Sequence, residues 1–407
     1  MRRRDVFLAI LLLTRRARAA EGYFPPPDNG GGGWRVAATA EAAARDAGLD
    51  QAKLEAAFDY VQQTSRNGGL LVARHGWLAF ERYFGKGHVE AAPNLASVGK
   101  AFTSIAAGIL LRERANFFPD GLDQRVWTSS FLPPEAFPPS DRRKSEIRLG
   151  QLLAMTAGIR GNNPGIVRGQ EVRLDPEGPD GSEAMVDEVA FGRRGGKRNA
   201  ITMWCDPGGG YSYATSSIHL VSVVLRHVTR GEMNDFVAVK LAKPLGWGRW
   251  GWGYRNRPDV RHTPGGGGIL MRARDLLRFA YMLLHNGRWG DQQVVPESYV
   301  EHCRNLSPYN PHYAYSLQFN VNRNGEAPAA PRDAFWKGGS GSHAFYVAPS
   351  LDLVAVKLGG RDGQYDPADT GLAAAPATSE RDPSWQPAID TDTAISRTLE
   401  LVAAAAL

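Results

Sequence analysis

Residues 94–112 read NLASVGKAFTSIAAGILLR, and this stretch decides which fold the rest of the chain is expected to form. From Gly99 to Arg112 it is apolar on every side, whereas a surface helix carries a single apolar stripe. It therefore predicts a buried helix. Ser97 and Lys100 form an S-x-x-K pattern at its beginning, and residues three apart share one face of a helix. We expect the serine hydroxyl and the lysine amine to be neighbours there.

This pair of side chains is suited to nucleophilic catalysis. A serine hydroxyl is a weak nucleophile until an adjacent base removes its proton. Lysine acts as that base when burial or a second cation lowers its pKa. The Ser97 amide at the helix N-terminus would also favour a developing negative charge. Chance yields about one or two S-x-x-K matches per 400 residues, and this single match stands at the start of an apolar helix.

Two other catalytic motifs are excluded. A phosphate-binding loop would need a glycine where Asn94 stands and a Ser or Thr where Ala101 stands. No G-x-S-x-G occurs, so a nucleophile-elbow hydrolase is disfavoured.

The first twenty residues have the features of an export signal. Arg2 to Arg4 form a positive start, Val6 to Leu13 an apolar stretch, and Ala17-Arg18-Ala19 a cleavage signal. Arg3-Arg4 before Val6-Phe7 also fits a twin-arginine signal, with an ordinary secretory signal as the alternative. We expect a signal peptide over 1–20 and a periplasmic or secreted protein.

Removal of residues 1–20 changes the charge of the chain. They hold six arginines and one aspartate, so the mature chain keeps a net charge of +1 out of +6. Nucleic-acid binding needs clustered positive charge, and the basic run 193–198 lies in a glycine-rich loop. No nucleic-acid partner is expected. An apolar stretch needs about twenty residues to cross a bilayer as a helix, and none in the mature chain comes close.

Cysteine and histidine spacing points to no metal site. The spacing of Cys205 and Cys303, the two cysteines of the chain, leaves open whether they form a disulfide. Neither C-x-x-C nor H-E-x-x-H occurs among these residues and the nine histidines. No metal and no cofactor is expected.

Hairpin signals near both ends of the chain predict a sheet. Apolar strands at 70–73 and 77–84 flank Arg74-His75-Gly76, and those at 344–347 and 353–358 flank Pro349-Ser350. Helical patterns cover 40–61, 99–112, 147–159, 216–228, 235–241, 275–284 and 391–405. Strands at both ends with helices between them predict one α/β sheet with an inserted helical lobe. The Pro/Gly-rich residues 21–36 are expected to be an extended leader before a single domain, 37–407.

Asn94 to Thr103 resembles the nucleophile motif of the β-lactamase-related serine hydrolases, especially class C enzymes, penicillin-binding proteins and family VIII esterases. Further similar segments follow in the family's order at 147–159, 207–215, 265–288 and 336–340. The resemblance spans about residues 55 to 360. It implies an α/β fold in which an antiparallel sheet is flanked by helices, with an inserted, mostly helical lobe. It also implies that Ser97 is the acylated nucleophile.

Residues 207–215 are similar to the family's Pro-Gly…Tyr-x-Asn element. The resemblance implies that Tyr213 relays protons between Ser97, Lys100 and the leaving group. Tyr211 is the competing candidate, two residues earlier. Thr215 replaces the family's asparagine, which contacts a substrate amide, and this departure puts recognition of peptide-like substrates in doubt.

The resemblance assigns Lys337 as a second catalytic cation at the edge of the cleft. Gly339 and Ser340 would line the substrate site, and the Ser340 amide would complete the oxyanion hole with that of Ser97. Gly338 lacks the hydroxyl with which β-lactam-recognising members hold a carboxylate. His343 and Lys337 are an even number of residues apart, so their side chains would point to the same face of a strand. Whether His343 reaches the cleft or has a structural role stays open.

Together these features predict acyl transfer. Ser97 attacks an ester or amide carbonyl, Lys100 and Tyr213 move protons, and water hydrolyses the acyl-enzyme. The partner is a small-molecule or peptide-like ester or amide, and esterase, D-amino-acid peptidase and β-lactamase-like activities remain open. The alternative is a non-hydrolytic, penicillin-binding-like receptor that uses the same cleft. The sequence does not decide the oligomeric state.

Overall fold

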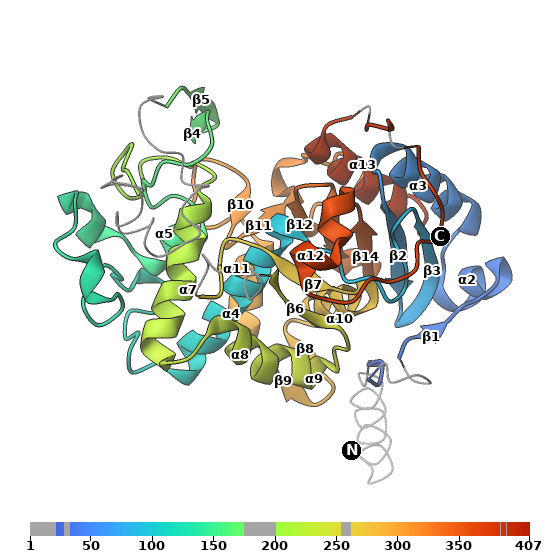
Figure 1. The fold of residues 1–407 in the computed structure, drawn as a ribbon, viewed down its shortest axis with the longest axis horizontal. Coiled ribbons are helices and arrows are strands. Elements are labelled where there is room, and N and C mark those ends of the chain that lie inside the picture. Colours follow the sequence, from blue (N-terminus) through green and yellow to red (C-terminus); the bar gives the residue numbers. More distant parts are fainter. Residues whose placement is uncertain (1–21, 28–32, 175–200, 254–261, 383, 388) are drawn as a thin grey trace, which may run out of the picture.

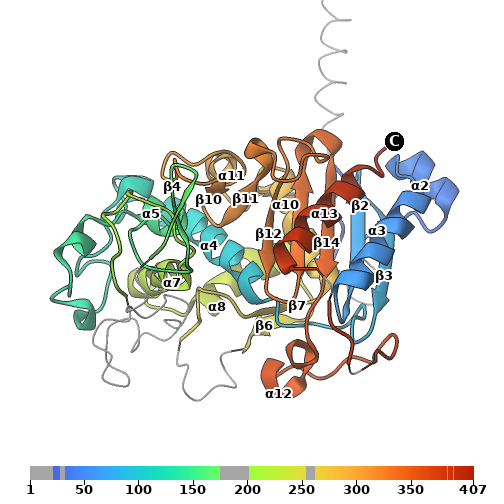
Figure 2. The same cartoon turned by 90° about the horizontal axis from the view of Figure 1, so that it is seen from above.

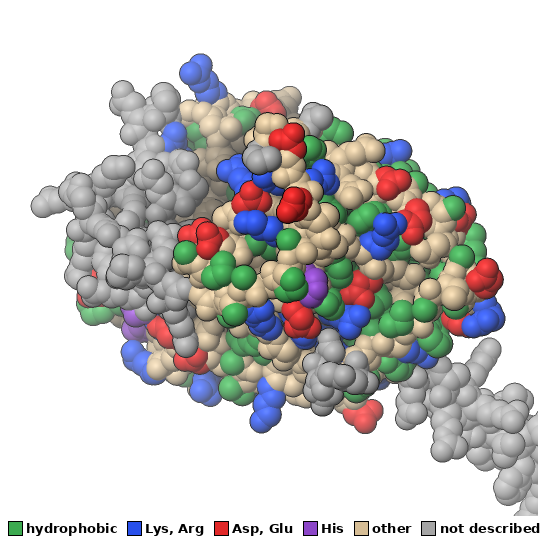
Figure 3. Space-filling view, turned by 45° about the vertical axis from the view of Figure 1, so that its right-hand side comes forward, with side chains coloured by type: hydrophobic (Ala, Val, Ile, Leu, Met, Phe, Trp, Pro, Cys, Tyr) green, Lys and Arg blue, Asp and Glu red, His purple; other side chains and the backbone are tan. Residues whose placement is uncertain are grey.

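The computed structural model describes the chain except residues 1–21, 28–32, 175–200, 254–261, 383 and 388. The expected signal peptide and the basic run 193–198 therefore lie outside the described residues. None of the helices in the described part is long and apolar enough to cross a membrane. On the face shown in Figure 3, acidic and basic side chains are interspersed and form no single-sign patch.

A central eight-stranded sheet organises the described part of the chain, in the order β1-β3-β2-β14-β13-β12-β11-β10. Neighbouring strands are antiparallel except β1 and β3, which run parallel. The strands are β1 (Arg35–Val36), β2 (Gly68–Arg74), β3 (Trp77–Phe84), β10 (Tyr315–Ser316), β11 (Phe319–Val321), β12 (Phe335–Gly339), β13 (His343–Ala348) and β14 (Leu353–Leu358). The two predicted hairpins are confirmed as β2/β3 and β13/β14.

Helices cover both faces of this sheet (Figures 1 and 2). One face packs on α2 (Ala40–Ala47), α3 (Gln51–Thr64) and α13 (Thr391–Ala403), and the other packs on α10 (Ala273–Leu284). Alternate residues of a strand point to opposite faces. Accordingly, Ala355 of β14 joins the core under α3 and α13, whereas Val356 joins the core under α10.

The inserted lobe is mostly helical and lies at the left of Figure 1. Its main helices are α4 (Gly99–Glu113), α5 (Leu149–Leu153), α7 (Thr215–Thr229) and α8 (Met233–Val237). Shorter elements complete the fold: α9 (Lys243–Leu245), α11 (Glu297–Arg304), α12 (Pro367–Thr370), and the strand pairs β4 (Gly165–Val167) with β5 (Gln170–Val172), β6 (Trp250–Trp252) with β7 (Ile269–Met271), and β8 (Arg288–Trp289) with β9 (Gln292–Gln293). The structure thus confirms an antiparallel sheet flanked by helices with an inserted helical lobe.

The single helix expected over 40–61 was wrong, because the chain forms α2 and α3 with a break between them. Gly48 ends α2 in the left-handed conformation, with φ of 59°. Asp50 then caps α3 by accepting hydrogen bonds from the amides of Ala52 and Lys53. A glycine C-cap followed by an aspartate N-cap stops one helix and starts the next.

The helix expected over 147–159 is also shorter than predicted. It covers Leu149–Leu153 only, and Met155 adopts a φ of 59°, which a helix does not allow. The helix expected over 235–241 begins earlier, at Met233. It changes at Ala238 to a π-helical turn that runs to Ala242.

Residues 22–27, in the Pro/Gly-rich segment expected to be a leader, form neither a helix nor a strand. The ring of Phe24 packs on Tyr281, with centroids 5.9 Å apart, and Arg278 donates a hydrogen bond to the Pro25 carbonyl at 2.9 Å. Residues 35 and 36 then form β1 at the edge of the sheet. This segment therefore packs against the same core as α10.

Candidate active site

Ser97 lies in a single 3₁₀ turn, Ala96–Val98, that leads directly into α4. One helical turn later, the buried Lys100 donates a hydrogen bond from Nζ to the Ser97 Oγ at 2.9 Å. The same amine donates to the Gly266 carbonyl at 2.6 Å. The glycine-rich segment fits closely, because a Cβ atom on Gly99 would lie 3.0 Å from the backbone of Gly267. Both hydrogen bonds hold the lysine amine at the serine.

Burial gives Lys100 the properties of a base. Only 1% of the residue is exposed, and removal from water lowers the pKa of its ammonium to about 7. Burial disfavours the charged form of a lysine, since no solvent stabilises that charge. A substantial fraction of Lys100 is therefore neutral at neutral pH and able to accept the Ser97 proton.

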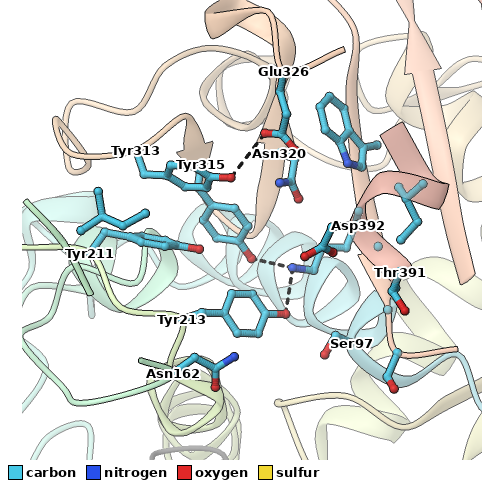
Figure 4. A pocket seen from close by; sticks show the side chains of 17 residues that line it. Ser97, Asn162, Tyr211, Tyr213, Tyr313, Tyr315, Asn320, Glu326, Thr391 and Asp392 are labelled. Atoms are coloured by element: carbon cyan, nitrogen blue, oxygen red, sulfur yellow. Dashed lines mark hydrogen bonds between the residues drawn. The ribbon is translucent and has the colours of Figure 1, made fainter. Parts of the chain in front are cut away.

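Tyr213, labelled in Figure 4, lies near both lysines of the site. The Nζ atoms of Lys100 and Lys337 lie 5.1 and 4.9 Å from the centre of its ring. Lys337 also donates a hydrogen bond to its hydroxyl at 3.2 Å. Burial raises the pKa of Tyr213, and a hydrogen bond with Ser97 opposes that rise. The phenol keeps its proton at neutral pH and contacts the serine.

Lys337 projects from β12 and is held by two tyrosine hydroxyls. It donates to Tyr315 at 2.6 Å as well as to Tyr213. Burial and the positive charge of Lys100 lower the pKa of Lys337 well below its usual range. Sequence reasoning missed Tyr315, because no motif marks a residue of β10 that reaches across the sheet to β12.

The end of β12 lies along the turn that carries Ser97. A Cβ atom on Gly339 would stand 2.5 Å from the Leu95 carbonyl oxygen and 3.1 Å from the Ser97 amide nitrogen. Only glycine fits this approach. The neighbouring Ser340 is exposed and lines the cavities on both sides of Ser97. This arrangement brings the two proposed oxyanion-hole residues to one edge of the site.

The remaining candidate residues lie in three different surroundings. Tyr211 packs its ring against Tyr315, with centroids 5.6 Å apart, and neither lysine lies over it. Thr215 begins α7 and lines the smaller cavity beside Ser97. His343 is fully buried and away from both cavities, and burial together with the charge of Lys357 lowers its pKa to about 3. His343 therefore has a structural position.

Two cavities meet at Ser97. The larger, of about 500 Å³, lies on the side of Tyr213 and is bordered by α13 and the loop between β11 and β12. The smaller, of about 400 Å³, lies on the side of Gly266 and is bordered by Arg361 and Gln364. Sequence reasoning missed the polar residues of the larger cavity, which belong to no family motif: Asn162, Tyr313, Tyr315, Asn320, Glu326, Thr391 and Asp392.

The two cysteines do not line either cavity. Cys205 and Cys303 are both free, and burial raises the pKa of the Cys205 thiol to about 11. Within the described residues, no group of three or more His, Cys, Asp or Glu side chains could hold a metal ion.

The fold and this arrangement of Ser97, Lys100, Tyr213 and Lys337 define a protein of the β-lactamase/transpeptidase-like class. The family model named Beta-lactamase matches residues 23–378, and the chain belongs to that family. No curated protein matches the chain in sequence.

Solved structures share the fold at low sequence identity. The hydrolase EstCE1, described as having promiscuous acyltransferase activity, is 16% identical with a TM-score of 0.59, covering 86% of this chain and 98% of its own. A penicillin-binding protein homologue from Caulobacter crescentus is 13% identical with a TM-score of 0.58, covering 88% and 99%. A putative 6-aminohexanoate-dimer hydrolase from Bacillus anthracis is 19% identical with a TM-score of 0.56, covering 80% and 77%.

Proposed function

We propose that this protein is a serine hydrolase that forms an acyl-enzyme at Ser97 from an ester or amide substrate. The observation that carries the proposal is the 2.9 Å hydrogen bond between Lys100 Nζ and Ser97 Oγ. It is supported by the pKa of Lys100, which burial lowers to about 7. A nucleophile hydrogen-bonded to a base that is partly neutral at working pH is what acyl transfer requires.

The reaction follows from these contacts. Neutral Lys100 accepts the Ser97 proton while Oγ attacks the substrate carbonyl and forms a tetrahedral oxyanion. The backbone amides of Ser97 and Ser340 stabilise that oxyanion. Tyr213 gives its proton to the departing alcohol or amine and recovers one from the Lys100 ammonium. Water then attacks the acyl-enzyme with the same groups acting in reverse, and the acid product leaves.

Within this chemistry we favour ester substrates over β-lactams. Gly338 offers no hydroxyl to a substrate carboxylate, and Thr215 replaces an amide-reading asparagine. A short ester needs neither contact, only the nucleophile and the oxyanion hole.

The proposal is tested with a fluorophosphonate probe and an ester substrate on the purified mature protein. Ser97 is expected to be the labelled residue by peptide mass spectrometry, and Ser97→Ala is expected to abolish both labelling and hydrolysis. Ser384→Ala, which changes an exposed serine far along the chain, is the control. Binding of substrates without turnover by the wild type would support the receptor alternative instead.

We also propose that the protein is exported to the periplasm or secreted. The support is the arginine-rich start, the apolar stretch 6–13 and the small residues before Ala20. Amino-terminal sequencing of exported material is expected to begin at Ala20 or Glu21. Recovery of an intact Met1 from that fraction would contradict the proposal.

A further inference from the structure

The larger cavity beside the nucleophile has both carboxylates and aromatic rings in its wall (Figure 4). Asp392 comes from the first turn of α13, and Glu326 comes from the loop between β11 and β12. The rings of Tyr211 and Tyr313 lie across the cavity from Asp392, with their centroids 5.0 Å apart. Lys337 is the one basic side chain among the described residues that line this cavity.

Within the part of the chain that the structure describes, neither Glu326 nor Asp392 forms an ion pair. The charge of Asp392 acts on Lys337, but burial and Lys100 outweigh it and lower the pKa of Lys337 well below its usual range, so Lys337 carries less positive charge than an ordinary lysine. Water exclusion around Glu326 raises the pKa of its carboxyl, and a cationic partner would relieve that cost. The cavity therefore has a net negative character.

A tyrosine hydroxyl in the same cavity makes no hydrogen bond to the described residues. Tyr211 is 7% exposed, and its hydroxyl points into the cavity (Figure 4). That hydroxyl makes no hydrogen bond to any residue that the structure describes. Buried polar groups are normally hydrogen-bonded, so this oxygen is available to a group that enters the cavity.

We propose that this cavity binds an ammonium group of the substrate, so that the enzyme selects esters or amides with a positively charged end. The inference rests on the proposed function and names its substrate class. Asp392 and Glu326 attract the charge, and the faces of the tyrosine rings attract a cation through their quadrupoles. The Tyr211 oxygen accepts a hydrogen bond when the group carries N–H. A volume of about 500 Å³ lies in the usual range for small-molecule sites.

The other side of Ser97 differs in charge, which orients the substrate. The smaller cavity is lined by Arg361 and by the backbone of the glycine-rich segment 266–268. An ammonium group there would face a like charge. The positive end of the substrate therefore lies toward α13, and the remainder of the substrate lies toward Arg361.

Matched esters test this selection, because exchanging one nitrogen for carbon removes the charge and keeps the shape. On the acyl side, p-nitrophenyl 4-(trimethylammonio)butyrate is compared with p-nitrophenyl 5,5-dimethylhexanoate. On the leaving-group side, butyrylthiocholine is compared with S-(3,3-dimethylbutyl) thiobutyrate. We expect kcat/KM for the cationic member of at least one pair to exceed that of its neutral partner by about tenfold or more. The ratio falls as salt is added.

Two carboxylate variants test whether the preference for the cationic substrate arises in this cavity. In Glu326→Gln and Asp392→Asn the ratio of cationic to neutral kcat/KM is expected to fall several-fold, and in the double variant it approaches one. Asp59→Asn, which removes an exposed carboxylate of α3 outside the cavity, is expected to keep the wild-type ratio. Labelling of Ser97 by a neutral fluorophosphonate shows that each variant is folded. The salt dependence of the ratio in the wild type is a further test that needs no variant.

The outcomes separate this inference from the proposed function. Equal kcat/KM within both pairs, or a preference that survives the double variant, overturns the ammonium site while hydrolysis itself stands. If neither member of either pair is hydrolysed and Ser97 is not labelled, the proposed function fails first.

Discussion

Ile395 of α13 lies against Gly338 of β12, and its Cδ1 atom is 2.6 Å from the point where a Cβ atom on Gly338 would stand. The tip of the Ile395 side chain therefore fills the space in front of Gly338. A side chain at position 338 would require the Ile395 side chain to move.

The proposed preference for esters rests on the hydroxyl that Gly338 lacks. We expect a higher kcat/KM on p-nitrophenyl acetate or butyrate than on a chromogenic cephalosporin or a D-Ala-D-Ala peptide. Hydrogen bonds to charged groups contribute about 1.5–3 kcal/mol, so one absent carboxylate contact lowers β-lactam turnover by about ten- to a hundredfold. Gly338→Ser combined with Ile395→Ala is expected to recover part of that turnover, whereas Ile395→Ala alone is not. Efficient cephalosporin hydrolysis by the wild type without esterase activity would contradict this account.

The base at Ser97 has a measurable pH signature. Neutral Lys100 is the reactive form, and the neutral fraction increases as the pH rises through its pKa of about 7. The kcat/KM of an uncharged ester is therefore expected to rise with pH, with a midpoint near 7, and then to level off. Lys144 is also buried and has a pKa lowered to about 8, but it lies near Trp127 in the helical lobe. Lys144→Met is expected to leave the midpoint in place, and Lys100→Met to remove the activity.

The two candidate tyrosines are distinguished by their contacts. Tyr213 receives a hydrogen bond from Lys337, and Lys100 and Lys337 both lie near its ring, whereas Tyr211 packs against other tyrosines. General acid–base groups contribute about 10²–10⁴-fold. Tyr213→Phe is expected to lower kcat by at least about a hundredfold, and by at least about tenfold more than Tyr211→Phe does. Tyr60→Phe, on α3, is the control. A larger loss in Tyr211→Phe would move the catalytic role to that residue.

The close approach at Gly339 supports the oxyanion hole. A methyl group there would push against the Leu95 carbonyl and the Ser97 amide. Gly339→Ala is expected to lower kcat by about 10²–10³-fold, the usual cost of losing an oxyanion donor, while the protein stays folded. Gly251→Ala is a matched control, because a Cβ atom on Gly251 meets no atom within 4 Å. Unchanged kcat in Gly339→Ala would rule out this geometry.

Much of the fold was accessible from the sequence because its signals are local. Hairpins β2/β3 and β13/β14 carry apolar runs around turn residues, and the apolar segment after Ser97 formed α4 as expected. Some helix boundaries were predicted wrongly although their stop signals are also local. The prediction gave more weight to the apolar periodicity than to these signals. Gly48 and Asp50 divide the segment 40–61 by their caps.

By itself the sequence determined that Ser97 and Lys100 are neighbours, because residues three apart lie on one face of a helix. Only the tertiary structure decided which groups surround that pair, since their contacts join segments far apart in the chain. The hydrogen bond from Lys337 to Tyr315 spans 22 residues, and Asp392 enters the cavity from the C-terminal helix. The lowered pKa of Lys100 is likewise a product of tertiary burial, because an exposed lysine in the same motif would keep its proton at neutral pH.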